Sequence, residues 1–184
     1  MPKRKTFGCS LGLAVAALLS LSACHRASFD EAPFRERGQA ALLPFKKALK
    51  QALVRGMEKG PEQAIDACRV QAPALAAASS NEEVSVGRTS HKLRNPSNAP
   101  EPWMLPLLET YGDPAQKEPR VVEIDAHTVG YVEPIYVQPL CVTCHGTSLA
   151  AAVQAQLRAQ YPADQATGFE VGDFRGLFWA KIRR

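Results

Sequence analysis

The hydrophobic positions between residues 34 and 57 recur at the spacing of one buried helix face. Apolar side chains stand three or four residues apart along this stretch, at Leu42, Phe45, Leu49, Leu53 and Met57. This period is that of an amphipathic helix whose apolar stripe faces a core. Pro44 lies inside the pattern, so we expect the helix either to begin near Pro44 or to kink there.

A second apolar stripe follows the break at Gly60-Pro61. Pro61 suits the first turn of a new helix, because the N–H that proline lacks would be unpaired there in any case. The stripe continues at helical spacing through Ile65, Cys68, Ala72 and Leu75. Two helices joined by a short turn predict an antiparallel helical hairpin.

Beyond residue 80 the pattern changes to short extended or alternating apolar stretches, which are typical of strands. Strands are predicted around residues 84–86, 121–124, 129–137 and 172–182. Two short helices are predicted between these strands. One covers about residues 102–111. The other follows Ser148, which is expected to cap it, and has an apolar stripe of Leu149, Val153 and Leu157. This order predicts an α+β fold, in which the N-terminal helical hairpin packs on an antiparallel sheet with one or two inserted helices.

The first residues contain, in order, the parts of a bacterial lipoprotein export signal. A basic patch at residues 3–5 precedes an apolar run over 7–21, which is too short to span a bilayer comfortably. The run ends in Leu21-Ser22-Ala23-Cys24, which resembles a lipobox, so Cys24 is the expected site of lipidation. The alternative is a plain signal peptide with an incidental cysteine.

Cleavage at this motif would remove the signal peptide, and the chain is predicted to have three segments in all. We expect a signal peptide over residues 1–23, a tether over 24–33 that follows the lipidated Cys24, and a single domain over 34–184. The lipid would hold the protein on the periplasmic side of a bacterial membrane. His25, rather than an acidic residue, follows Cys24 and favours the outer membrane.

The net charge of +4 belongs largely to the predicted signal, which holds three basic residues and no acidic one. The remaining chain is therefore close to neutral, and nothing in it indicates a nucleic-acid partner.

The chemistry is concentrated in Cys141-Val142-Thr143-Cys144-His145, the attachment pattern of a c-type haem. In one helical turn, positions i, i+3 and i+4 lie on one side. Cys141 and Cys144 can therefore form thioethers with one haem, while His145 binds its iron as the proximal ligand. Gly146 is expected to leave room for the macrocycle near the backbone.

Two alternative interpretations of the same cysteines and histidine are a redox-active dithiol and a zinc site. Cys141 and Cys144 could form a redox-active dithiol, although a thioredoxin-like fold would place that motif after a βαβ beginning. A zinc site would need further ligands, for which only His91, His127 and Cys68 remain. The specificity of the five-residue pattern favours one covalent haem c.

Further motif-like stretches stand outside the haem pattern, at Ala64-Ile65-Asp66-Ala67-Cys68, Ala72-Pro73, Gly87-Arg88-Thr89-Ser90, Leu93-Arg94-Asn95-Pro96-Ser97-Asn98-Ala99-Pro100, Tyr161-Pro162-Ala163-Asp164-Gln165-Ala166-Thr167-Gly168 and Gly172-Asp173-Phe174-Arg175-Gly176. In order and spacing they resemble a family of periplasmic single-haem proteins with a PAS-like sensor domain. This family was formerly a domain of unknown function and includes cyanobacterial c-type haem sensors. The resemblance covers roughly residues 35–184.

The resemblance implies a PAS-like sheet and names Cys68 as the second axial ligand of the iron, opposite His145. Without it, the residues alone favour a buried structural cysteine over a ligand. Met57 and Met104 are expected in the core. Arg88 and Arg94 are candidates for contacts to the haem propionates.

A thiolate ligand stabilises ferric iron and lowers its potential, which disfavours a high-potential electron shuttle. We therefore expect a redox or diatomic-gas sensing module, in which reduction releases Cys68. The alternative is a low-potential periplasmic electron-transfer cytochrome. A peroxidase-like enzyme using His91 or His127, and a thiol–disulfide oxidoreductase, rank below these, so turnover is not expected. Besides the membrane, the expected partner is an unidentified redox or signalling protein.

Overall fold

The computed structural model describes Met1 and residues 29–184, so Cys24 and all of the predicted signal peptide except Met1 lie outside the described residues. Within the predicted tether, Phe29 stacks on Phe34 with ring centroids 5.5 Å apart. The guanidinium of Arg184 lies over the Phe29 ring at 5.0 Å. The packed part of the chain therefore includes residues that precede position 34.

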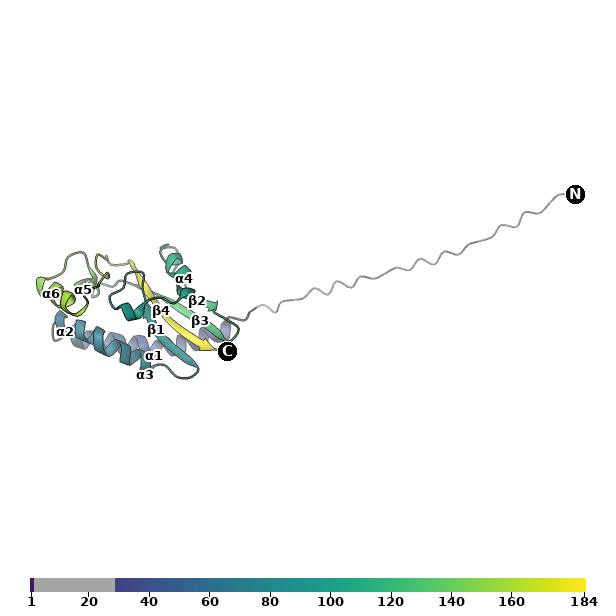
Figure 1. Ribbon diagram of the computed structural model, residues 1–184, viewed down its shortest axis with the longest axis horizontal. Coiled ribbons are helices and arrows are strands. Elements are labelled where there is room, and N and C mark those ends of the chain that lie inside the picture. Colours follow the sequence, from purple (N-terminus) through teal and green to yellow (C-terminus); the bar gives the residue numbers. More distant parts are fainter. Residues whose placement is uncertain (2–28) are drawn as a thin grey trace.

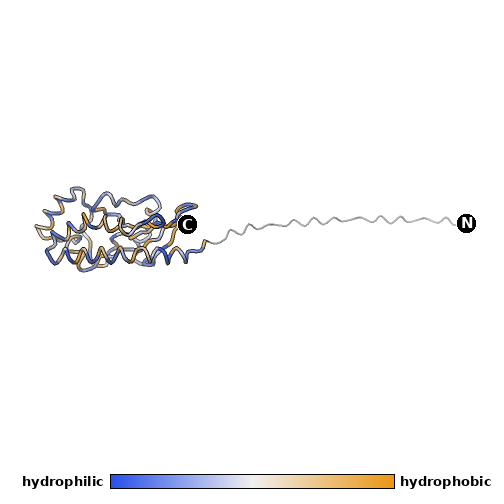
Figure 2. The backbone as a smooth tube through the Cα atoms, turned by 90° about the horizontal axis from the view of Figure 1, so that it is seen from below, coloured by the Kyte–Doolittle hydropathy of each residue, from blue (hydrophilic) through white to orange (hydrophobic). Residues whose placement is uncertain are grey.

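Helix α1 (Ala32–Met57) lies along one face of the sheet (Figure 1). It buries the predicted stripe, with Leu42, Phe45 and Leu49 in the core, and hydrophilic and hydrophobic positions alternate along it in Figure 2. The helix continues through Pro44, so the expectation that it begins near this proline is wrong. Residues on both sides of Pro44, including Leu42 and Phe45, belong to one core cluster with the sheet, which offsets the backbone hydrogen bond that proline cannot donate.

The predicted second helix is present but divided into three pieces. Helix α2 (Pro61–Asp66) begins at the predicted proline, a π-helical turn η1 (Ala67–Gln71) follows, and helix α3 (Ala72–Ala78) completes it. All three pack against α1, which confirms the helical hairpin. Cys68 lies in η1. Such π-turns are rare in proteins, and those that occur often lie at functional sites.

The four predicted strands form one antiparallel sheet in the order β1-β4-β3-β2. Strand β1 (Val84–Thr89) pairs with β4 (Phe174–Arg183), β4 with β3 (Thr128–Tyr136), and β3 with β2 (Arg120–Glu123). The α+β class is therefore confirmed. Because β3 and β4 occupy the centre of the sheet, they supply most of the strand residues in the core cluster to which α1 contributes.

Short helices fill the connections between strands. Between β1 and β2 the chain forms two 3₁₀ turns, η2 (Pro96–Asn98) and η3 (Pro102–Met104), and helix α4 (Leu105–Thr110). Leu107, Leu108 and Tyr111 pack against the side of the sheet that carries Val132 and Leu177.

Between β3 and β4 the chain forms helices α5 (Val142–His145) and α6 (Ala151–Gln160), which lie beside α2 at one end of the molecule (Figure 1). Val153 and Leu157 of α6 are buried, as predicted. The predicted cap is wrong, because α6 begins after Ala150 and no side chain caps it. No helix of the described residues is long and apolar enough to cross a membrane.

Candidate functional site

A cavity of about 460 Å³ opens between α1, α2, η1, α5 and the nearby ends of the strands. Its volume lies within the range of about 300–1,000 Å³ that is typical of ligand pockets. Much of its wall is apolar, and its other lining residues include four sulfur-bearing side chains, one histidine and three arginines, at Met57, Cys68, Cys141, Cys144, His145, Arg88, Arg94 and Arg175. The structure therefore brings every predicted haem residue to one cavity.

The motif itself folds as a tight turn at the cavity wall. Cys141 immediately precedes α5, and its carbonyl accepts hydrogen bonds from the N–H groups of Cys144 (3.1 Å) and His145 (2.9 Å). These bonds set the one-turn spacing that the sequence predicts, so both thiols and the imidazole face the same space.

Two contacts fix the orientation of the His145 ring. Its Nδ1 lies 2.7 Å from the carbonyl oxygen of Ala166, so Nδ1–H donates and Nε2 is left to accept or to bind a metal. The Phe169 ring packs edge-on against the imidazole, with centroids 6.4 Å apart. Burial, and secondarily the charges of Arg94 and Arg175, hold the pKa of His145 well below its usual range. The ring is therefore neutral at pH 7, as a metal ligand must be.

Gly146 is required by the conformation of the turn that carries the motif. A Cβ at this position would lie 2.5 Å from the carbonyl oxygen of Val142, which is too close for any side chain. The Gly146 carbonyl accepts the N–H of Gly168, and the His145 carbonyl accepts that of Phe169, both at 3.0 Å. The backbone of the turn itself therefore requires a glycine at this position, and that Gly146 also makes room for a macrocycle stays a prediction.

Arg94 braces the turn. Its Nη2 donates to the carbonyl oxygens of Cys144 (2.6 Å) and Ala166 (3.1 Å), and its Nε donates to Oδ2 of Asp164 (3.1 Å). The side chains of Arg94 and Asp164 are only 10% and 9% exposed. Asp164 also accepts the N–H of Ala166 through Oδ1. Arg94 thus lines the cavity with a guanidinium that is already engaged by the protein.

Cys68 reaches the same cavity from η1, a segment remote in sequence from the motif. Cys144 and Tyr161 line the same cavity. Burial raises the pKa of both groups, and the nearby Cys68 adds to this effect. None of Cys68, Cys141 and Cys144 is in a disulfide.

The cavity lining also includes residues that were not among the predicted site residues. Met57, expected in the core, lines the cavity, as do Tyr161 and Arg175. Tyr161 and Arg175 lie within the motif-like stretches of the sequence, which is the signal that could have singled them out. Met104 is buried in the core as expected.

The remaining histidines lie elsewhere. His91 stacks on Phe174 with centroids 5.5 Å apart, outside the cavity wall, and His127 is exposed in the turn before β3. Among the described residues, no group of three His, Cys, Asp or Glu side chains is arranged to hold a metal ion.

The environment of Cys144 bears on the dithiol alternative. Burial raises the pKa of its thiol, and the opposing charge of Arg94 does not cancel this effect. Reactive cysteines of disulfide oxidoreductases have lowered pKa values, because the thiolate is the nucleophile. Cys144 is therefore a poor nucleophile at neutral pH.

Together the fold and the cavity define an α+β protein whose single antiparallel sheet positions a Cys-x-x-Cys-His turn against a ligand-sized cavity. The chain belongs to the Tll0287-like family, whose model matches residues 24–183.

The crystal structure of the cyanobacterial heme-protein Tll0287 is similar to this chain with a TM-score of 0.61 and 23% sequence identity. The match covers 85% of this chain and 98% of that chain, and at this identity it establishes the fold. No curated protein matches the chain in sequence.

Proposed function

We propose that the chain binds one haem in this cavity, attached covalently to Cys141 and Cys144, with His145 as the proximal ligand. The observation that carries the proposal is the convergence of both thiols and a neutral, oriented imidazole on one ligand-sized cavity. Its relative with the same fold is described as a heme-protein. When bound, the haem would supply one-electron chemistry and an iron site for small ligands.

The donor set fits this group. Hydrogen bonding of Nδ1 to Ala166 leaves Nε2 of His145 for the iron, which is the usual arrangement of a histidine ligand. The two thiols are half-buried at the same wall, within one helical turn of each other. The apolar lining would exclude water from the macrocycle, and the arginines would offset its carboxylates.

We infer that Cys68 is the second axial ligand. It comes to the cavity on a different element from the motif, as a ligand on the opposite side must. Met57 is the alternative, because it also lines the cavity and a thioether can bind haem iron. The π-helical turn that carries Cys68 supports the cysteine, since such turns often mark functional positions.

The role that follows is redox or diatomic-gas sensing. If Cys68 binds the iron, it would couple the haem to η1, which could act as a two-state element between α2 and α3. Low-potential electron transfer is the second candidate, favoured if η1 does not move. A peroxidase role has weaker support, because the cavity wall holds no histidine besides His145 among the described residues.

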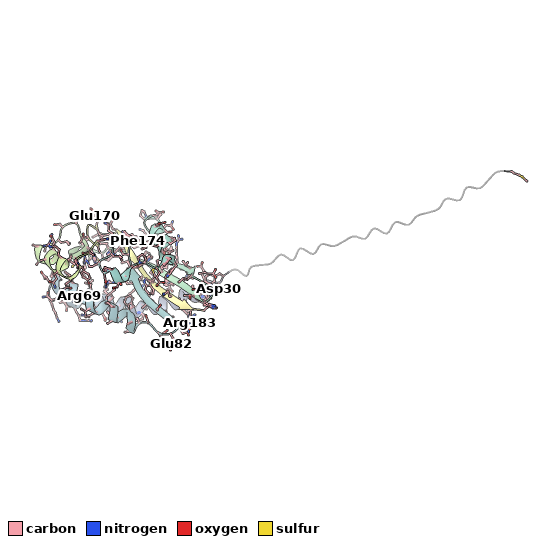
Figure 3. All side chains as sticks on the ribbon, viewed as in Figure 1. Asp30, Arg69, Glu82, Glu170, Phe174 and Arg183 are labelled. Atoms are coloured by element: carbon pink, nitrogen blue, oxygen red, sulfur yellow. The ribbon has the colours of Figure 1, made fainter. Side chains whose placement is uncertain are left out.

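The proposal includes a PAS-like domain on the periplasmic side of a membrane, anchored by lipid at Cys24. Asp30, near the start of the described chain, and Arg69, next to Cys68, lie at opposite ends of the molecule in Figure 3. An anchor at Cys24 would therefore leave the cavity at the end remote from the membrane. Replacing Cys24 by serine should move the protein from the membrane fraction to the soluble fraction.

The test of haem binding uses the chain exported in a host that attaches haem c. Wild type should retain its haem after denaturation and acid extraction, whereas the double variant Cys141→Ala/Cys144→Ala should lose it. Haem that is extracted from wild type would contradict covalent attachment, and wild type without any haem would end the proposal.

The distal ligand is tested by electron paramagnetic resonance and absorption spectra of ferric wild type, Cys68→Ala and Met57→Leu. Wild type and Met57→Leu should share a low-spin thiolate signature that Cys68→Ala lacks. If only Met57→Leu changes the spectrum, Met57 is the ligand. Identical ferric and ferrous coordination of Cys68 would favour electron transfer over sensing.

A further inference from the structure

The acidic and basic side chains that line the cavity are all of one sign. Its lining includes five cationic side chains and no carboxylate, namely Lys46, Lys50, Arg88, Arg94 and Arg175. Lys46 is paired with Glu133 outside the wall, and Arg94 with Asp164. Over the described residues, Lys50, Arg88 and Arg175 have no ion-pair partner.

Arg175 is the most firmly positioned of these three. Its Nη1 donates to Oγ of Ser90 (2.6 Å) and to the carbonyl oxygen of Lys92 (3.1 Å). The next residue, Gly176, allows β1 and β4 to approach closely, because a Cβ there would lie 2.1 Å from the carbonyl oxygen of Thr89. The Phe169 ring, 5.2 Å from the guanidinium carbon, supports it from another side.

The same guanidinium lacks the anion that its burial requires. Its Nε is buried and has no hydrogen-bond partner, although buried donors are normally paired. Burial, followed by the charges of Arg88 and Arg94, lowers the pKa of Arg175 to about 10. A protein holds a desolvated, unpaired cation in a cavity most readily when a ligand brings the opposite charge.

We propose that Arg175, together with Arg88, binds a carboxylate of the haem and that these two cations raise the haem's midpoint potential. The inference rests on the proposed function and concerns a residue outside the motif. A guanidinium is suited to this role because its fork of N–H groups matches a carboxylate. Arg94 is less available for this contact, because Asp164 and two backbone carbonyls occupy its Nε and Nη2 and leave only Nη1.

The charge of Arg175 also acts on the iron. A buried cation beside the haem disfavours the extra positive charge of the ferric form, so it favours reduction. Removing that cation should therefore shift the equilibrium toward ferric haem, in the same direction as a thiolate ligand does.

The test uses haem-loaded wild type, Arg175→Gln, Arg175→Lys and the control Arg55→Gln, which removes an exposed arginine of α1 that does not line the cavity. At a fixed applied potential, Arg175→Gln should lower the ferrous-to-ferric ratio about tenfold, which corresponds to about 59 mV for one electron. Arg55→Gln should change the ratio less than about twofold. The propionate bending band of the resonance Raman spectrum should shift in Arg175→Gln and in Arg175→Lys.

Arg175→Lys keeps the positive charge, but lysine cannot reproduce the fork of N–H groups that a guanidinium offers to a carboxylate. This variant also tests the proposal if Arg175→Gln does not accumulate. Its ferrous-to-ferric ratio should stay near wild type while its propionate band shifts, and an unshifted band would overturn the assignment. The assignment also fails if Arg175→Gln behaves like Arg55→Gln in both measurements. Wild type without haem would instead refute the proposed function, so the two failures are distinguishable.

Discussion

Nη2 of Arg94 donates a hydrogen bond of 2.6 Å to the carbonyl oxygen of Cys144. This bond joins the loop after β1 to the turn that carries the Cys-x-x-Cys-His motif, 50 residues further along the chain. Because Asp164 holds the same guanidinium, the motif is anchored to two separate loops at once.

Replacing Arg94 by alanine should therefore destabilise the protein strongly. Breaking a buried ion pair leaves an uncompensated carboxylate and costs about 3–5 kcal/mol. For a chain of this size each kcal/mol lowers the melting temperature by about 2–4 °C. Thermal unfolding of wild type, Arg94→Ala and Arg55→Gln should show a large drop only in the second.

Asp164→Ala provides the matched partner variant. Because Arg94 and Asp164 belong to one network, the double variant should lose less stability than the sum of the two single losses. Full additivity would show that the pair does not act as a unit.

Acid should destabilise the haem-free protein through two histidines. Burial, assisted by nearby cations, lowers the pKa of His145 and of His91 in the folded state, whereas the unfolded chain has ordinary values near 6.5. As pH falls through 6.5, the unfolded state takes up protons that the folded state does not. The free energy of unfolding should fall by at most about 1.4 kcal/mol per pH unit for each histidine.

Urea unfolding between pH 8 and pH 5 measures this slope, with the haem-free chain lacking residues 1–23. His145→Gln should flatten it, whereas His127→Gln, which removes an exposed histidine, should leave it unchanged. A pH-independent free energy of unfolding in wild type would mean that neither His145 nor His91 is kept neutral by the fold.

Gly146→Ala should displace the motif, because the new Cβ would meet the carbonyl oxygen of Val142 at 2.5 Å. We expect a loss of about 1–3 kcal/mol, as for other overpacked sites, and a lower yield of attached haem. Melting temperature and the ratio of haem absorption to protein measure both effects. The neighbouring variant Ser148→Ala should be nearly silent, because Ser148 is exposed and caps no helix. Equal behaviour of the two variants would contradict the packing role of Gly146.

Cys144 should alkylate slowly in the haem-free folded protein. Burial raises the pKa of its thiol, so less of the reactive thiolate is present at neutral pH than in the unfolded chain. The pH profile of iodoacetamide labelling, followed at this peptide by mass spectrometry, should have a higher midpoint in the folded chain than in denaturant. A lower midpoint in the folded chain would support the dithiol oxidoreductase instead.

Local pattern was sufficient for most of the secondary structure and for the motif. The local sequence was enough to predict the helix face from Leu42 to Leu49 and the four strands, because side-chain periodicity follows directly from backbone geometry. Cys141, Cys144 and His145 were identifiable for the same reason, since their spacing within one turn is a local property. The helix caps and breaks were less predictable: Pro44 is tolerated by contacts with the sheet, and α6 begins without a side-chain cap.

The tertiary structure decided that Met57, Tyr161 and Arg175 share the cavity with the motif, whereas Cys68 was already expected there from the family resemblance. Cys68, Met57 and Arg175 come from separate elements, and their meeting depends on how α1, η1 and β4 pack rather than on any local period. It also separated two arginines that look alike in sequence: Arg94 is engaged by Asp164 and two carbonyls, whereas Arg88 has no ion-pair partner in the described part of the chain. The five-residue motif thus predicted which residues carry the chemistry, and packing decided their surroundings, because burial and charge depend on contacts between remote segments.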